Sequence, residues 1–195
     1  MIDAILAKAK GLLVSPVETF QASRADRTDV AAPYLIVLLL VHAIMTALIS
    51  LIGISAMGVF AHMAPRFAMP VAVFFSVLIG GAVLTILFSL WLHLWVYLLG
   101  GRKGLLETAK AVIYGLTPAM LLGWIPLIGL LFCLWSVVLQ IIGIRELQEM
   151  SSGKALAAMV IAVMIPLIVL VLLAMYFFVS MVSIAAVPGA PYNFV

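Results

Sequence analysis

Residues 70–99 read PVAVFFSVLIGGAVLTILFSLWLHLWVYLL, an unbroken apolar run without Asp, Glu, Lys or Arg. A helix needs about 20 apolar residues to cross the hydrocarbon core of a bilayer, which is roughly 30 Å thick. The run is therefore long enough to cross a membrane with some tilt. This segment alone indicates an integral membrane protein.

The composition of the whole chain agrees with that interpretation. Of its 195 residues, 67% are hydrophobic and 9% are charged, whereas a soluble globular domain carries about 25% charged residues. The net charge of +3 does not indicate nucleic-acid binding, because the basic residues lie between apolar runs rather than along one face. We therefore expect membrane lipids as partners, and no nucleic acid.

The same length criterion predicts an all-α, polytopic transmembrane helix bundle of five spans. Residues 1–32 precede it as a cytoplasmic or interfacial segment, and residues 187–195 follow as a short outer tail. Pro33, Pro70 and Pro126 each fall at a predicted helix start, where a missing amide proton costs nothing. The predicted five-helix domain is 33–186, with spans at 33–60, 70–99, 105–122, 126–148 and 154–186.

Two short helices are expected before the first span. An apolar stripe at near-helical spacing predicts an interfacial helix over residues 2–13, the alternative being a frayed polar tail. Ser15 and Glu18 have the spacing of a capping box around Pro16, which predicts a second helix that carries Phe20. The stripe consists of Ile2, Ile5, Leu6, Ala9 and Leu13.

The basic residues predict the orientation. Cytoplasmic loops hold an excess of Lys and Arg, and nine of the ten in this chain fall on one side if five spans alternate. The N-terminus is then cytoplasmic and the C-terminus outside. The nine are Lys8, Lys10, Arg24 and Arg27 before the first span, Arg102, Lys103 and Lys110 around the second connection, and Arg145 and Lys154 around the fourth; Arg66 is the exception.

Few polar side chains lie within the spans. His42 and His93 fall in the cytoplasmic halves of the first two spans and could approach each other. The simplest interpretation is a neutral imidazole bonded to a neighbouring helix, with a proton relay or metal site as the alternative. Gln140 is expected to bond across helices, or else to line a pathway. No Asp or Glu lies deep in a span, which weakens the metal interpretation.

Ser89 and His93 are four residues apart, as a nucleophile and its base could be. Nothing in the sequence orients that histidine, and a membrane serine usually bonds its own backbone. We therefore assign no catalytic residue, no metal ligand and no cofactor. Trp91, Trp95 and Tyr97 have the spacing of an aromatic belt at the membrane surface.

The third span should be broken at residues 114–118. Pro118 has no N–H, so the carbonyl of Tyr114 loses its helical partner and must find another donor in the lipid environment. Gly115 allows a neighbouring helix to approach, and the Thr117 hydroxyl can supply a local bond. Tyr114, Gly115 and Pro118 are therefore candidate hinge positions, on a helix that faces the interior.

The end of the fourth span carries a charged turn. Arg145 and Glu149 are four residues apart and are expected to pair at the membrane surface. Arg145 and Glu146 are candidate interaction residues on the cytoplasmic face.

Several short motifs in order resemble the Yip-domain family, whose eukaryotic members are also described as Ypt/Rab-interacting (YIPF) membrane proteins. The resemblance extends over roughly residues 10–185. The motifs are Ser15-Pro16 with Phe20, Tyr114-Gly115-Leu116-Thr117-Pro118, Gly123-Trp124-Ile125-Pro126-Leu127-Ile128-Gly129, Trp135, Gly143-Ile144-Arg145-Glu146, and Ser152 followed by Lys154-Ala155-Leu156.

The resemblance implies five helices and a cytoplasmic N-terminus, in agreement with the charge count. Eukaryotic relatives act in early secretory traffic and associate with small GTPases, but they place a long cytoplasmic region before the first helix. Here only about 32 residues precede it, so a small GTPase partner is doubtful and the chain looks more like a short prokaryotic member, in the cell membrane. The family offers no catalytic residues to carry over.

Without a catalytic constellation, the sequence favours a non-enzymatic membrane organiser or adaptor that binds other membrane proteins, lipids or a second copy of itself. The alternative is a small transporter, channel or lipid-moving protein with a polar interior around His42, His93 and Gln140.

The orientation is testable by cysteine labelling in a Cys133→Ala background, which removes the only native cysteine. Arg66→Cys and Ala190→Cys should react with a membrane-impermeant maleimide added to intact cells. Arg102→Cys and Ser151→Cys should react only after the membrane is opened. The reverse pattern would contradict the orientation, and labelling of Arg66→Cys and Ala190→Cys from opposite sides would contradict the span count.

Overall fold

The computed structural model describes residues 2–51 and 68–185, which form helices and turns with no strand among them. Five helices in these ranges are long and apolar enough to cross a membrane: Thr28–Leu51, Ala68–Leu98, Leu105–Leu122, Ile128–Leu147 and Ser152–Ser183. The prediction of an all-α chain with five spans is confirmed. The predicted end of the first span, 52–60, and the tail, 187–195, lie outside the described residues.

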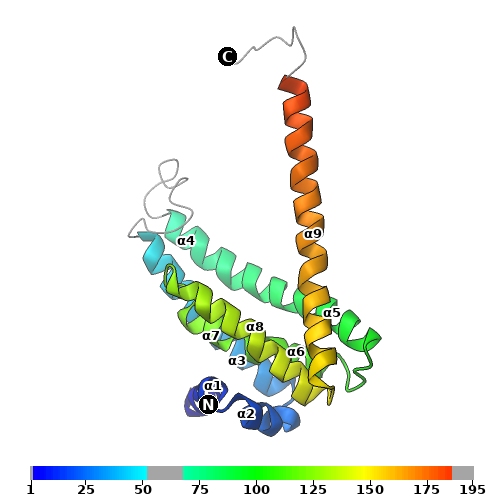
Figure 1. Cartoon of the computed structure of the whole chain (residues 1–195). Coiled ribbons are helices and arrows are strands. Elements are labelled where there is room, and N and C mark those ends of the chain that lie inside the picture. Colours follow the sequence, from blue (N-terminus) through cyan, green and yellow to red (C-terminus); the bar gives the residue numbers. More distant parts are fainter. Residues whose placement is uncertain (1, 52–67, 186–195) are drawn as a thin grey trace.

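The helices are arranged as a bundle with two short helices across one end (Figure 1). The second span is nearly continuous, with one π-helical stretch, η3, inside it. The elements are α1 (Ile2–Val14), α2 (Pro16–Ala22), the 3₁₀ turn η1 (Ser23–Ala25), α3 (Thr28–Leu51), α4 (Ala68–Phe75), η3 (Ser76–Gly80), α5 (Gly81–Leu98), α6 (Leu105–Gly115), α7 (Thr117–Leu122), α8 (Ile128–Leu147) and α9 (Ser152–Ala185).

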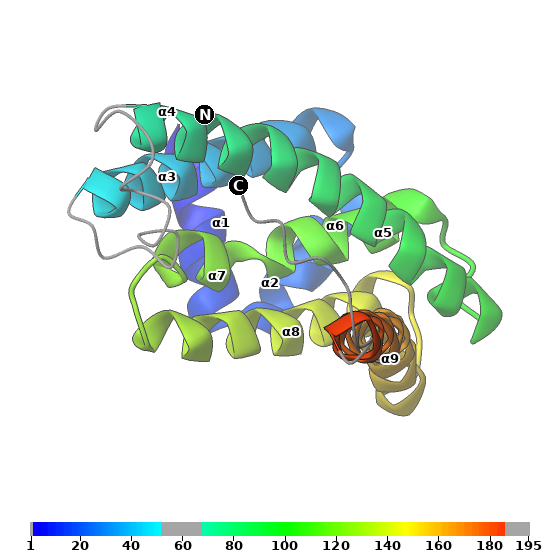
Figure 2. The ribbon, with the colours of Figure 1, turned by 90° about the horizontal axis from the view of Figure 1, so that it is seen from above.

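The third span, α6 and α7, occupies the middle of the bundle. Figure 2 shows it between α3–α5 on one side and α8 on the other. Ala111, Val112 and Tyr114 of α6 are fully buried. A polar helix such as α6 is stable in a membrane when protein covers its polar groups. The polar residues of α6 therefore require a position at the centre of the bundle, where other helices cover them.

The predicted break in this span is present, at Leu116 between α6 and α7. Pro118 donates no bond to the Tyr114 carbonyl, and the Thr117 hydroxyl donates to that carbonyl instead, at 2.6 Å. Beside the break, Gly115 touches α8 so closely that a Cβ there would lie 2.4 Å from the Cγ of Gln140. The predictions of a break and of an interior position are confirmed.

The first span begins earlier than predicted. α3 starts at Thr28, so Pro33 lies inside the helix rather than at its start. The bond that Pro33 cannot make would go to the carbonyl of Asp29, an exposed residue. Near a helix end that carbonyl can reach water or lipid headgroups, which explains why the helix tolerates this proline.

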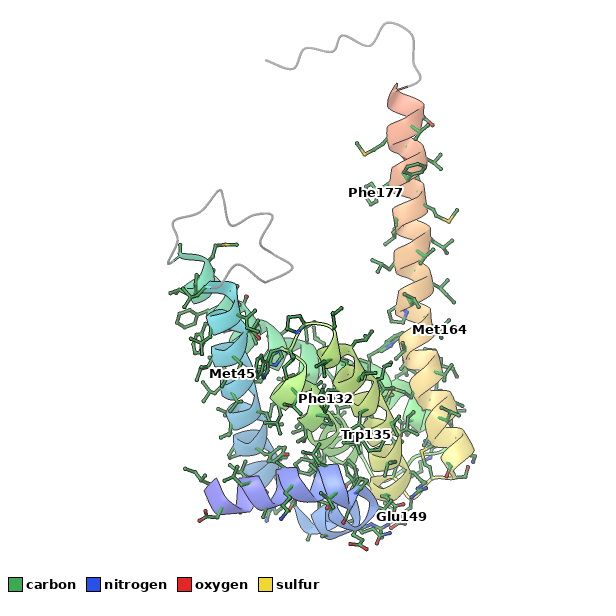
Figure 3. All side chains as sticks on the ribbon, turned by 60° about the vertical axis from the view of Figure 1, so that its left-hand side comes forward. Met45, Phe132, Trp135, Glu149, Met164 and Phe177 are labelled. Carbon is green, nitrogen blue, oxygen red and sulfur yellow. The ribbon has the colours of Figure 1, made fainter. Side chains whose placement is uncertain are left out.

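The two N-terminal helices form, but the capping box does not. Pro16 is at the first position of α2, while the Ser15 side chain makes no cap hydrogen bond. The Thr19 hydroxyl instead donates to the Ser15 carbonyl at 2.8 Å. Figure 3 shows α1 lying across the ends of the spans. Phe20 of α2 is fully buried.

The last helix, α9, packs only along its first half. Its buried side chains are Ala155, Ala158, Met159 and Ala162, mostly small residues that allow close approach to α5 and α8. Beyond them α9 stands apart from the other helices, as Met164 and Phe177 show in Figure 3. These two side chains are 43% and 64% exposed, so lipid or another protein must cover them.

A hydrogen bond beside Pro166 links α9 to α5. Pro166 has no N–H for the carbonyl of Ala162, and the Trp91 indole donates to that carbonyl at 2.9 Å. Trp91 therefore has a specific interior partner in addition to the belt position expected from the sequence. The indole of Trp95, one turn away, is buried without a partner among the described residues.

This pairing predicts a double-mutant result. Trp91→Phe should lower the free energy of unfolding by about 1 kcal/mol, within the range measured for hydrogen bonds between membrane helices. In a Pro166→Ala background the loss should be smaller, because the substitution restores a backbone N–H that can bond the Ala162 carbonyl. Thermal unfolding in detergent measures both.

Trp95→Phe is the matched control, since it removes an indole N–H that has no partner in the described structure. It should cost less than Trp91→Phe. Equal losses from the two substitutions, or no change with Pro166→Ala, would contradict the role given to Trp91.

Candidate functional site

A fully buried lysine lies at the centre of the polar end of the bundle. The Lys110 side chain is 0% exposed, and its Nζ donates to the backbone carbonyls of Ser23, Arg24 and Asp26 at 3.0–3.1 Å. Its charge is paired with Glu107 at 2.8 Å. A buried charge is tolerated only with such partners. We refer to Lys110, Glu107, Asp26, Tyr114 and Lys8 as the Lys110 site.

The three carbonyls lie where the N-terminal helices end, and that of Ser23 also accepts the backbone N–H of Asp26 at 3.1 Å. The last carbonyls of a helix have no intrahelical partner and carry partial negative charge. The Lys110 ammonium group donates hydrogen bonds to these carbonyls and places a positive charge beside their partial negative charge. Lys110 therefore holds the end of α2 and η1 against α6, across more than 80 residues of sequence.

The carboxylate of Asp26 joins the same site. The Tyr114 hydroxyl donates to Asp26 Oδ2 at 2.6 Å, and Lys8 of α1 pairs with that oxygen. The Lys8 ammonium also lies 4.5 Å from the centre of the Tyr114 ring, a distance suited to a cation–π interaction. Both short helices are thus attached to α6 through one carboxylate.

Tyr114 also connects this site to the helix break. The single Thr117 hydroxyl proton is donated to the Tyr114 carbonyl. In the 2.8 Å bond between Tyr34 and Thr117 the tyrosine must therefore be the donor. The hydrogen bonds therefore run from the Tyr34 hydroxyl of α3 to the Thr117 hydroxyl, and from that hydroxyl to the Tyr114 carbonyl of α6. The Tyr34 ring also packs edge-on against the Tyr114 ring, with 5.2 Å between the ring centres.

Phe20 is the apolar counterpart of these bonds. A Cβ on Gly143 would lie 2.8 Å from the Phe20 ring and 3.0 Å from Ala111. The ring of α2 thus fits between α6 and α8 only because residue 143 has no side chain.

A second group of charges surrounds Glu146. This residue is only 9% exposed, with Gln21 donating to it at 2.9 Å and Arg145 pairing with it at 2.7 Å. Arg24 donates to the Glu146 backbone carbonyl at 2.9 Å. The structure places Glu146 inside the end of the bundle, where it holds α2, while the side chain of its neighbour Arg145 is 35% exposed.

The prediction that Arg145 and Glu149 pair with each other is wrong. α8 ends at Leu147 and Glu149 has a positive φ of 53°, so the helical spacing no longer applies. Glu149 instead pairs with Lys103 at 2.6 Å and with Arg24 at 3.5 Å. The hydrogen bond from Lys103, with the nearby positive charges, lowers the pKa of Glu149; any stabilisation from this is lost as the pH falls through that lowered pKa.

The two span histidines have separate partners. His42 Nδ1 bonds the backbone carbonyl of Met120 at 3.1 Å, and His93 Nδ1 bonds the Thr108 hydroxyl at 2.8 Å. Twelve residues, about 18 Å of helix, separate these partners, so the two imidazoles do not meet. Within residues 2–51 and 68–185, no three His, Cys, Asp or Glu side chains form a group suited to a metal.

The remaining candidates lie at the centre of the bundle. The Ser89 hydroxyl donates to its own helix, at the Thr85 carbonyl, rather than to His93. Gln140 is buried beside Gly115, and Pro118 is buried next to the break. Their roles as pathway or hinge residues stay predictions.

Lys110, Asp26 and Glu107 are not among the site residues predicted from the sequence. Lys110 contributes only to the predicted orientation, although a lysine inside a predicted span is itself a functional signal. The spacing supplies a second signal, because Glu107, Lys110 and Tyr114 lie three and four residues apart and so share one helix face. Nothing local marks Asp26 as their partner.

Removal of the Lys110 charge should release the N-terminal segment, residues 2–26. Lys110→Met leaves Glu107 without its ion pair and removes the donor to the carbonyls of Arg24 and Asp26, a loss of about 3 kcal/mol or more. Limited trypsin digestion of opened membranes should then cut faster after Arg24 and Arg27. Lys154→Met, at an exposed lysine, is the control and should leave the digestion rate unchanged. Equal rates in the two variants would show that Lys110 does not hold the segment.

Among the comparisons with known proteins, a family model matches most of the chain. Neither the curated proteins nor the solved structures gave a match. The family model described as Yip1 domain matches residues 10–189. The matched region includes α2 with Phe20, the broken third span and all five helices that are apolar enough to cross a membrane. The chain therefore belongs to the Yip1 domain family of integral membrane proteins.

Proposed function

We propose that this protein is a non-enzymatic membrane organiser or adaptor that binds another membrane-associated protein at its charged face. The charged face consists of Arg24, Lys103, Glu149 and Arg145. The observation that carries the proposal is that this face is built on a fixed support. Arg24 belongs to the N-terminal segment, which Lys110 and Glu146 attach to the bundle.

The residues of the face are available for binding. The side chains of Arg24, Lys103 and Glu149 are 46–48% exposed, while those that hold the support, such as Lys110, are buried. Exposed charges contribute little to stability, but they can select a partner and speed its association. A fixed pattern of both signs therefore supports recognition of a protein with complementary charges.

The same arrangement supports the proposed orientation. Lys8, Lys103, Lys110 and Arg145 come from four different helices or loops and share polar contacts at one end of the bundle. By the excess of basic residues this end is cytoplasmic. We propose the cell membrane of a prokaryote as the location, with the charged face towards the cytoplasm.

A small transporter, channel or lipid-moving protein is the second candidate. It is supported by two adjoining hollows within the spans, one lined by His42 and the other by Gln140. Vesicle flux and lipid-scrambling assays test it, and activity no higher than that of empty vesicles would exclude it.

The adaptor proposal can be tested by photo-crosslinking in native membranes. A benzoylphenylalanine at Ser151, an exposed residue close to the charged face, should capture a reproducible protein or a second copy of the chain. The control position is Leu130, which is 67% exposed near the opposite end of α8. It should capture only lipid.

Lys103→Glu combined with Glu149→Lys keeps an ion pair between positions 103 and 149 but reverses both charges, and it gives up the exposed pair of Glu149 with Arg24, which contributes little to stability. Capture from Ser151 should then fall severalfold, while thermal stability changes little. If Ser151 captures no protein and no second copy, the adaptor proposal is wrong.

A further inference from the structure

Two adjoining hollows lie in the membrane-spanning part of the bundle. The first, about 280 Å³, lies among α5, α6, α7, α8 and α9 and is lined by apolar side chains apart from Thr85 and Gln140. The second, about 300 Å³, lies among α3, η3, α5 and α7. Both are lined by Gly81, Leu84 and Met120.

Gln140 is the polar group in the first hollow that has no partner within the described part of the chain. Its side chain is more than nine-tenths buried, at 5% exposure. The Thr85 hydroxyl in the same hollow is already used, since it donates to the Gly81 carbonyl at 2.7 Å. The Gln140 amide makes no hydrogen bond to any other described residue. The amide atoms are not among the fully sealed, unpaired polar atoms of the described residues, which are Trp95 Nε1 and Glu107 Oε2; Gln140 lines the hollow. In these apolar surroundings an amide without a partner is costly, so this one points to a ligand with a polar atom in the hollow.

The position of Gln140 along α8 indicates where that polar atom belongs. Five residues separate Gln140 from Arg145 of the charged face, about 7.5 Å of helix. The headgroup region on each side of a bilayer is about 5–7.5 Å thick. With Arg145 among the headgroups, Gln140 lies where the headgroups meet the hydrocarbon. The ester carbonyls of phospholipids occupy that level.

The second hollow leads further into the membrane. It is lined by Ser76, Val77 and Gly80 of η3, on the far side of Gly81 from Gln140. No atom lies within 4 Å of the place where a Cβ on Gly80 would start. The two polar side chains of this hollow, His42 and Ser76, are already hydrogen-bonded to the carbonyls of Met120 and Val73. The other side chains that line it are apolar, so a hydrocarbon chain can continue into it from the first hollow.

We propose that the two hollows hold one acyl chain of a membrane phospholipid, whose ester carbonyl accepts a hydrogen bond from the Gln140 amide. This site is separate from the charged face and does not depend on the adaptor role. It requires binding alone and no transport of the lipid.

The test uses the full chain in dodecyl maltoside and a phosphatidylcholine with a diazirine midway along one acyl chain. After illumination, mass spectrometry should locate the label on residues that line the hollows, such as Leu84 and Met120. Unlabelled diester phosphatidylcholine should compete. Its dialkyl ether analogue, which lacks the ester carbonyl, should compete about fivefold less well, the value of one hydrogen bond.

Gln140→Met keeps the unbranched stem that packs against Gly115 and removes the amide. In this variant the ester and ether lipids should compete equally. Gly80→Leu should fill the second hollow and abolish labelling there, because its backbone is helical and the space beside it is open. Gly153→Leu adds the same side chain to a helix with equally open surroundings and should leave labelling unchanged.

Equal competition by the ester and ether lipids in the unaltered chain would overturn the proposal. So would labelling confined to the exposed half of α9 around Phe177, which would mean ordinary contact with surrounding lipid. If Gly80→Leu unfolds, the comparison of the ester and ether lipids in Gln140→Met still tests the proposed hydrogen bond. Either failure leaves the Ser151 crosslink unaffected, so this site and the adaptor role are tested separately.

Discussion

The buried ammonium group of Lys110 is the interaction on which the rest of the structure depends. A charge inside a helix bundle must be paired within the protein, because neither lipid nor an apolar core can solvate it. Glu107 neutralises it, and the carbonyls at the end of η1 complete its hydrogen bonds. The N-terminal segment is therefore part of the folded bundle rather than a tail. α6, which carries the lysine, lies at the centre for the same reason.

Two of the span prolines, Pro118 and Pro166, show the same constraint applied to the backbone. Pro118 and Pro166 each leave one carbonyl without its helical donor, and a membrane supplies none. Thr117 compensates locally, one residue before its proline, and the span breaks into two helices. Trp91 compensates from another helix, and so attaches α9 to α5 at one level. The donor that compensates for Pro118 is local, whereas the donor that compensates for Pro166 belongs to another helix and adds a contact between helices.

The Lys110 site and the first hollow adjoin the same short stretch of α6. Tyr114 bonds Asp26 of the N-terminal segment, and the next residue, Gly115, touches Gln140. The contact with Gln140 exists because residue 115 has no side chain. The motif Tyr-Gly-Leu-Thr-Pro therefore supplies a hydrogen-bond donor, a helix contact and a break within five residues.

The sequence by itself determined the class of the protein, its five spans, the break at Pro118 and the membership of its family. Each of these depends on local properties, namely the length of an apolar run, the missing N–H of proline and the order of short motifs. Only the tertiary structure decided that Lys110 meets Asp26, that Glu146 is inside, and that His42 and His93 do not meet. Those pairings join residues far apart in the chain, and they depend on how the helices pack. Helical periodicity can give the face on which a side chain lies, but it does not give the helix that this face meets.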